Sequence, residues 1–185
     1  FEARLKALNT RVGMNSGHLT ITITDNQFWA RMAFSGPYTG QMSSQYIHTG
    51  SRCPSIKDDR NGDGYLDFIE AHDVVGDILI PLDSVLESQL RGMNLFPKIK
   101  RNNGYYYSEA TNFTRMMEDL RRVDTFSDDR IRKLHRNEEL DLTTRVVMVY
   151  GVSDERNLPE TIESYEGYSP QASLPVACSE IVDLF

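Results

Sequence analysis

Alternating apolar and polar residues at two places near the start of the chain predict strands that bury one face. Residues 18–24 alternate in this way and are rich in β-branched types, and residues 28–34 carry an apolar side chain at every second position. A short polar turn at Asp25 and Asn26 separates the two runs. The pattern therefore predicts an antiparallel hairpin.

Further short runs of aliphatic, β-branched or aromatic residues predict strands at 45–50, 78–82, 104–108, 145–151 and 174–182. Pro81 favours an edge position or a strand end for the second of these, because proline cannot donate to a sheet. Residues 153–173 are polar, contain two prolines and are predicted as a long loop. The sum is a mainly β, antiparallel sandwich or barrel, formed as a single domain over residues 1–185.

Three stretches show helical rather than strand signals. Apolar residues in 113–120 recur at the helical spacing, on one stripe of a helix that starts near Thr111 or Asn112. The methionine pair in this stripe is expected in the core rather than in a groove for a partner. Ser127 and two acidic residues after it predict a second helix over 127–135. Residues 68–75 are expected to form a short helix that Gly76 terminates.

The acidic stretch 58–70 carries the most specific motif in the chain. Counted from Asp59, oxygen-bearing side chains occupy positions 1, 3, 5, 9 and 12, with glycine at 6 and an apolar residue at 8. This is the spacing of an EF-hand calcium loop, in which about six to eight oxygens surround the ion. The predicted ligands are the side chains of Asp59, Asn61 and Asp63, the main-chain carbonyl of Tyr65, Asp67 directly or through water, and both oxygens of Glu70.

Pro54 lies too close to this loop for a long entering helix. We therefore expect an isolated calcium loop, inserted at about residues 54–76 into a β-domain. Between Lys57 and Asp77 seven acidic residues stand against two basic ones, so cation binding and folding of the segment should be coupled. The alternative is an acidic surface turn without metal, which gives no reason for the complete spacing through Glu70.

Composition limits the classes of function. The chain is 39% hydrophobic and 25% charged, which is typical of a globular protein. Its formal charge of −7 disfavours a nucleic-acid partner, because such surfaces need clustered Lys and Arg. No apolar run approaches the length of about 20 residues that a transmembrane helix needs. The sequence contains no Gly-rich phosphate loop, no Gly-x-Ser-x-Gly elbow and no HExxH helix.

Two cysteines bear on the compartment. Cys53 follows the strand predicted at 45–50, and Cys178 lies in the last predicted strand. On their own the two residues leave open a disulfide or two buried free thiols. A calcium loop of low affinity is most useful outside the cytosol, where calcium is plentiful and where disulfides persist.

Three segments carry a family resemblance: YIHTGSRC at 46–53, GDILIPL at 76–82 and ACSEI at 177–181. They resemble landmarks of bacterial CHRD-type domains and, more distantly, of copper/zinc superoxide dismutases, whose opening strands are also similar to the hairpin at 17–36. The resemblance implies a Greek-key β-sandwich in which Cys53 pairs with Cys178 and the calcium loop is inserted after Cys53.

The departures from the dismutase pattern concern its metal ligands. A dismutase site needs a cluster of about six histidines and an aspartate, and this chain has four histidines in all. His48 matches one histidine of the family's paired motif, but Tyr46 stands at the partner position. Met148 and Tyr150 occupy the strand where another copper histidine is expected. Dismutase activity is therefore not expected.

These observations predict an exported, non-enzymatic, calcium-binding β-sandwich protein of the bacterial cell envelope, with a mainly structural calcium ion. We expect it in the periplasm or at the cell surface, where a removed N-terminal leader could supply a lipid anchor and where an envelope protein could be its partner. The alternative is a protein that binds copper or another transition metal, or a residual dismutase-like protein, through His48.

Overall fold

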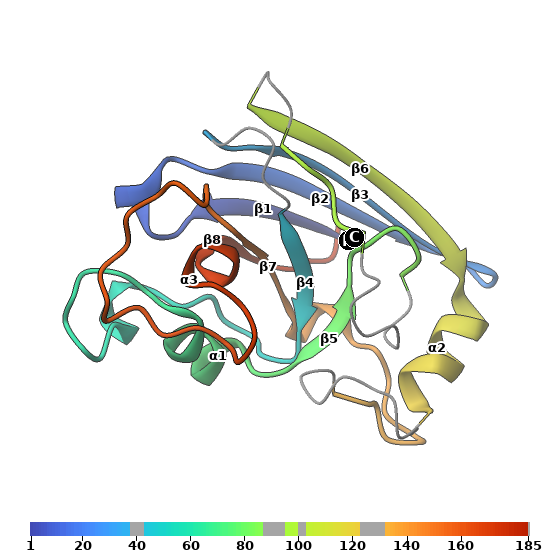
Figure 1. Ribbon diagram of the computed structural model, residues 1–185. Helices are drawn as coiled ribbons and strands as arrows, with labels where there is room; N and C mark the ends of the chain where they lie inside the picture. The colour runs from blue at the N-terminus through green and yellow to red at the C-terminus, as the bar shows by residue number, and fades with distance from the viewer. Residues whose placement is uncertain (38–42, 87–94, 100–102, 123–131, 185) are drawn as a thin grey trace.

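The computed structural model describes residues 1–185 except 38–42, 87–94, 100–102, 123–131 and 185. In the described residues, eight antiparallel strands form one sheet in the order β5-β4-β7-β8-β1-β2-β3-β6. Their bounds are β1 Glu2–Ala7, β2 Ser16–Ile23, β3 Gln27–Ser35, β4 Ser44–His48, β5 Ile78–Pro81, β6 Gly104–Asn112, β7 Val146–Tyr150 and β8 Pro175–Glu180. The sheet curls, so that the half containing β1, β2, β3 and β6 lies over the half containing β4, β5, β7 and β8 (Figure 1).

Several connections between the strands cross from one half to the other. β6 pairs with β3 and β7 returns to pair with β4, so these neighbours in space are not consecutive in sequence. Such returning connections between antiparallel strands are those of a Greek-key arrangement. The predicted fold class, mainly β with antiparallel strands in a sandwich-like form, is confirmed.

The predicted hairpin is formed by β2 and β3, which pair in register from Ser16 opposite Ser35 to Ile23 opposite Phe28. Every second residue of β3 is buried, as the alternation predicted: Phe28, Ala30, Met32 and Phe34. These side chains join Leu19 and Ile21 of β2 in the main hydrophobic core. That core also takes Ile47, Leu79 and Val147 from the other half of the sheet, so it fills the space between the halves.

β7 differs from the hairpin because all five of its residues are buried. Val147 and Val149 face the main core, whereas Val146, Met148 and Tyr150 belong to a second hydrophobic cluster on the outer face. Helix α1 (Phe68–Val75) supplies Phe68, Ala71 and Val75 to this second cluster. The segment inserted after Cys53 therefore covers the outer face of β7 (Figure 1).

The helices agree with the sequence in part. α1 ends at Gly76, as expected, and α2 (Phe113–Arg121) starts after its N-cap Asn112 and buries both methionines. The helix expected over 127–135 is wrong in its last part, because residues 132–135 are not helical, and the rest lies outside the described residues. The backbone of this stretch bonds to other segments instead: Arg132 N–H donates to the carbonyl of Ile78, and Leu134 N–H to that of Leu120.

One strand and one α-helix had no counterpart among the sequence predictions. No strand was predicted where β1 runs, and α3 (Pro170–Ser173) lies inside the predicted long loop. β1 lies between β2 and β8, where it has partners along both edges. The predicted edge position of β5 is confirmed, because it ends the order of described strands.

Candidate calcium site

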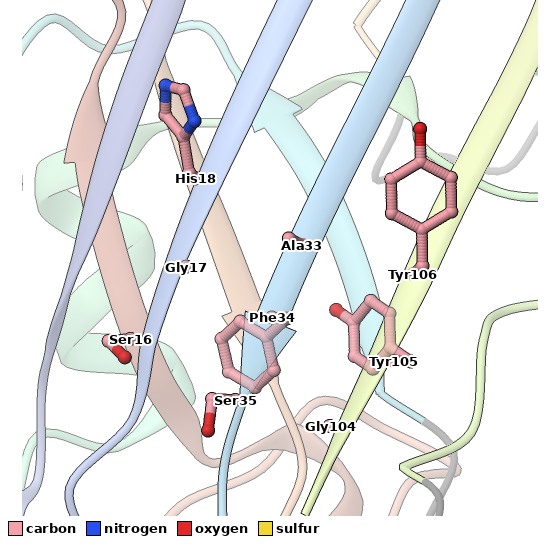
Figure 2. Close-up of a pocket in the computed structure, with 9 residues that line it drawn as sticks. All are labelled: Ser16, Gly17, His18, Ala33, Phe34, Ser35, Gly104, Tyr105 and Tyr106. Carbon is pink, nitrogen blue, oxygen red and sulfur yellow. The ribbon is translucent and has the colours of Figure 1, made fainter.

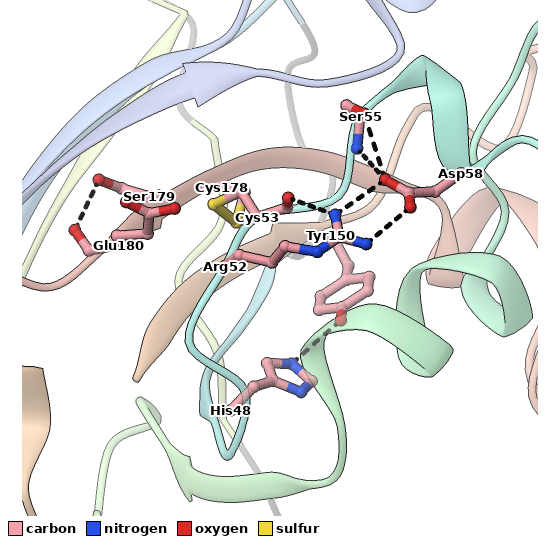
Figure 3. Close-up of a disulfide and its surroundings, with 9 residues drawn as sticks. All are labelled: His48, Arg52, Cys53, Ser55, Asp58, Tyr150, Cys178, Ser179 and Glu180. Carbon is pink, nitrogen blue, oxygen red and sulfur yellow. Dashed lines mark hydrogen bonds and ion pairs between the residues drawn. A yellow bond between two sulfur atoms is a disulfide. The ribbon is translucent and has the colours of Figure 1, made fainter. Parts of the chain in front are cut away.

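The chain enters the acidic loop directly after a disulfide. Cys53 is bonded to Cys178 of β8, with 5.9 Å between the Cα atoms, so the predicted pairing is confirmed (Figure 3). The bond closes a sequence separation of 125 residues. It fixes the start of the insertion against a strand at the centre of the described sheet.

A short 3-10 helix, Ile56–Asp58, takes the place of a long entering helix, in agreement with the expectation from Pro54. Ser55 caps it, and the carboxylate of Asp58 accepts from the Ser55 N–H at 2.8 Å. Arg52 donates to the same carboxylate at 2.8 and 3.1 Å (Figure 3). The hydrogen bonds from Arg52 hold the pKa of Asp58 down to about 2, although its partial burial acts in the opposite direction.

In the loop itself, three predicted ligands turn back over the main chain. The Asp59 carboxylate accepts from the N–H groups of Gly62 and Gly64 at 2.7 and 2.8 Å. Asn61 Oδ1 accepts from Asp63 N–H at 2.9 Å, and Asp63 Oδ1 accepts from Tyr65 N–H at 2.8 Å. Gly62 and Gly64 have φ of 74° and 83°, a conformation in which a side chain is strained. The predicted sharp turn is therefore present.

The last predicted ligand, Glu70, folds across the loop from the first turn of α1. One carboxylate oxygen accepts from the N–H groups of Arg60 and Asn61 at 2.7 and 3.3 Å. The other accepts from Asp67 N–H at 3.2 Å, while Asp67 accepts from Glu70 N–H at 2.9 Å. The two acids thus form a reciprocal cap at the helix N-terminus, where the macrodipole stabilises negative charge.

Asp67 also links the loop to the segment that precedes α3. Its second oxygen accepts from Glu163 N–H at 3.0 Å, and its side chain is almost fully buried. The Thr161 hydroxyl donates to Asp63 at 2.5 Å, and the main-chain carbonyl of Thr161 accepts from the Asn61 amide at 3.3 Å. A pocket at this junction is lined in part by Glu70, Glu160 and Glu163. This contact was not predictable from local sequence patterns, because it joins residues about one hundred positions apart.

A turn after β1 holds the opposite side of the loop. Arg11 donates to the main-chain carbonyl of Asp63 at 3.1 Å and lies over the ring of Tyr65, 5.5 Å from its centre. A side chain at Gly64 would displace the flexible Arg11 guanidinium, and the positive φ at this position is what favours glycine. Asn9, in the same turn, bonds to the main chain of Leu66.

The predicted ligands therefore occupy one loop, and each carboxylate among them accepts at least one main-chain N–H. No group of three or more His, Cys, Asp or Glu side chains in the described part of the chain is gathered closely enough to hold a metal ion. Calcium binding by Asp59, Asn61, Asp63, Tyr65, Asp67 and Glu70 consequently stays a prediction.

His48, the residue on which the alternative interpretation depends, is buried at the other end of α1. Its Nδ1 lies 2.9 Å from the carbonyl oxygen of Gly76, and its Nε2 lies 3.0 Å from the hydroxyl of Tyr150 (Figure 3). Because a carbonyl only accepts, Nδ1 carries the proton and Nε2 accepts from Tyr150. Burial lowers the pKa of His48 to about 4. Both ring nitrogens of this neutral imidazole are thus occupied.

A separate hollow lies on the outer face of β2, β3 and β6. Figure 2 shows His18 and Tyr106 projecting on either side of Ala33, which pairs with both of them across the strands. Tyr106 is exposed, whereas its neighbours Tyr105 and Tyr107 are buried, and burial raises the pKa of both buried phenols. None of the predicted ligands lies in this hollow.

A search against protein-family models and curated proteins finds no match for this chain. Among the described residues, no helix is both long enough and apolar enough to cross a membrane. The assignment of function therefore depends on the chemistry of the sites described above.

Proposed function

We propose that this chain is an exported, non-enzymatic, calcium-binding β-sandwich protein of the bacterial cell envelope. The observation that carries the proposal is the loop from Asp59 to Glu70. It combines the twelve-residue spacing of oxygen-bearing side chains with left-handed glycines, carboxylates that accept main-chain N–H groups of the loop, and a closing glutamate on the following helix.

Calcium would be held by the side chains of Asp59, Asn61 and Asp63, the carbonyl of Tyr65, Asp67 directly or through water, and both oxygens of Glu70. Apart from Glu70 Oε1, each carboxylate oxygen of this set accepts one hydrogen bond and keeps a further lone pair for a cation. Glu70 Oε1 accepts from both Arg60 and Asn61, so it would exchange one of these bonds for the ion. The ion supplies two positive charges to a segment with a large excess of acidic residues. Its role is structural, because Asp67 and Glu70 lie at the start of the helix that covers β7.

The disulfide supports export. Such bonds persist in oxidising compartments, where calcium is also abundant enough to fill a loop of modest affinity. We place the protein in the periplasm or at the cell surface, attached to lipid if its leader carries an acylated cysteine. The first residues encoded by the gene provide the test: a start without any export signal would contradict this placement.

The resemblance to CHRD-type and superoxide dismutase-like domains gains support from the same bond. The strand that carries His48 leads to Cys53, and Cys53 pairs with the last strand, which is the arrangement the resemblance implied. The alternative function, copper or other transition-metal binding at His48, is disfavoured, since Gly76 and Tyr150 already occupy both ring nitrogens.

Calorimetry tests the proposal. Protein stripped with a chelator is titrated with calcium beside a variant that combines Asp59→Ala with Glu70→Gln. We expect saturable heat from the wild type, with a dissociation constant of about 10⁻³ M or tighter, and no such heat from the variant. A matched control is Asp154→Ala with Glu155→Gln, an exposed acidic pair outside the loop, which should bind as the wild type does. Equal heats from the wild type and the Asp59/Glu70 variant would overturn the proposal.

A further inference from the structure

Asn9 is a buried amide that bonds to two distant parts of the chain. Its Oδ1 accepts from Leu66 N–H at 2.7 Å, and its Nδ2 donates to the carbonyl of Leu66 at 2.7 Å. The same Nδ2 donates to the carbonyl of Pro175, at the start of β8, at 2.8 Å. These three bonds join residues 57 and 166 positions away in sequence.

The side chain of Asn9 bonds to the main chain of Leu66 in the way that a neighbouring β-strand would. A strand partner satisfies both the N–H and the C=O of one residue, and the carboxamide of Asn9 does the same with one short side chain. Aspartate has the same shape but no donor for the two carbonyls. Asn9 also has a left-handed backbone, with φ of 46°, which asparagine tolerates better than most residues.

The position of Leu66 in the loop gives these bonds a consequence for the proposed site. Leu66 lies between Tyr65, whose carbonyl is a predicted ligand, and Asp67, which caps α1 and bonds to Glu163. Asn9 lies two residues after the end of β1, and Leu8 N–H, between them, bonds to the carbonyl of Val176 in β8. The main chain that carries two predicted ligands is thereby fixed relative to β1 and β8.

We propose that Asn9 is a positioning residue for the calcium loop, which sets its affinity by holding the main chain of Leu66 in place. This inference rests on the calcium site proposed above and adds a residue outside the loop that controls it. A partner that orients a metal ligand without touching the ion typically contributes about ten- to hundred-fold to metal affinity.

Calcium titration of Asn9→Asp tests the inference. Both residues tolerate a left-handed backbone, so the substitution adds no backbone strain. It removes the two donated hydrogen bonds and sets a carboxylate oxygen against the carbonyls of Leu66 and Pro175. We expect affinity to fall about ten-fold or more. The added negative charge attracts calcium directly, so a loss of affinity would come from the displaced main chain of Leu66. The matched control is Asn15→Asp, which alters another buried asparagine whose amide bonds only weakly, at 3.4 Å to Gly13, and which lies away from the loop. It should leave the affinity within about two-fold.

A second measurement covers the case in which Asn9→Asp fails to fold. In the wild type, calcium should shift the NMR signals of the Asn9 side-chain amide and slow its exchange with water, whereas the Asn15 amide should stay unchanged. If the wild type binds calcium but the Asn9 amide does not respond, or Asn9→Asp folds and binds as tightly as the wild type, the positioning role is wrong. If the wild type does not bind calcium at all, the proposed function fails first.

Discussion

Two polar centres lie at the two ends of α1 and differ in how their hydrogen bonds are completed. At the N-terminal end, the carboxylates of Asp67 and Glu70 accept main-chain N–H groups beside an open pocket. At the C-terminal end, the neutral imidazole of His48 bonds to Gly76 and Tyr150 inside the core. A charged oxygen with a remaining lone pair has capacity for a cation, whereas an imidazole with both nitrogens bonded has none. Residue type alone therefore does not distinguish a metal ligand from a structural contact.

The largest expected effect comes from breaking the covalent link that fixes the loop to β8. Replacing Cys53 and Cys178 with serine should lower the free energy of unfolding by about 5 kcal/mol, because the bond closes a loop of more than 100 residues in the unfolded chain. Urea unfolding of the double variant and the wild type measures the difference. Wild type unfolded under reducing conditions should behave like the variant, and a difference below about 1 kcal/mol would contradict the prediction.

Replacement of His48 tests the opposite centre. His48→Ala should lower the free energy of unfolding by roughly 4 kcal/mol, because it leaves a cavity and removes the buried partners of Gly76 and Tyr150. The half-exposed His72, which lies on α1 and pairs with Asp77, provides the control: His72→Ala should cost less than about 1 kcal/mol. Calcium heats should persist in both variants. If the purified wild type contained copper or zinc and His48→Ala did not, His48 would be a metal ligand. The contrast drawn between the two centres would then be wrong.

Acid should weaken the His48 centre over a defined pH range. The pKa of His48 is about 4 in the folded protein, against an ordinary value of 6.5. Between these two pH values, His48 is protonated in the unfolded chain but neutral in the folded protein. This contribution to stability is complete above pH 6.5, decreases as the pH falls towards 4, and changes no further below it. The total loss is roughly 3 kcal/mol. Nearby His72 opposes protonation of His48 and Asp77 favours it, but burial is the larger cause.

The measurement is the free energy of unfolding as a function of pH for the wild type and His48→Gln. The difference between the two curves isolates His48 from the carboxyl groups that both proteins share. A difference that stays constant from pH 7 to pH 4 would show that His48 is not the group responsible.

The smallest expected effect concerns the contact of the loop with residues 161–163. Thr161→Val removes the hydroxyl that bonds to Asp63 and keeps the shape of the side chain. Because the bond is exposed, stability should fall by less than about 1 kcal/mol, and calcium affinity by no more than about five-fold. Thr143→Val is the matched control, since Thr143 makes the same kind of exposed bond to Asp141. An equal change in calcium affinity in both variants would show that Thr161 makes no specific contribution to the site.

The hairpin of β2 and β3 was predictable because a strand with one buried face has a period of two in its own sequence. The same holds for α1 and α2, where apolar stripes and terminating residues are local signals. β1 escaped prediction because its place in the sheet depends on pairing with β2 and β8, and β8 lies at the far end of the chain. The helix expected over 127–135 fails over 132–135 because the local signals there compete with backbone bonds to Ile78 and Leu120.

For the candidate site, the sequence by itself determined the ligand spacing from Asp59 to Glu70, the glycine turn and the absence of a long entering helix. These features depend on residues within one short segment, where side chains meet the adjacent main chain. Tertiary structure alone decided the contacts of Asn9, Arg11 and Thr161 with that segment, and it placed His48 between Gly76 and Tyr150. Such contacts join residues distant in sequence, and the packing of the curled sheet, rather than any local pattern, brings them together.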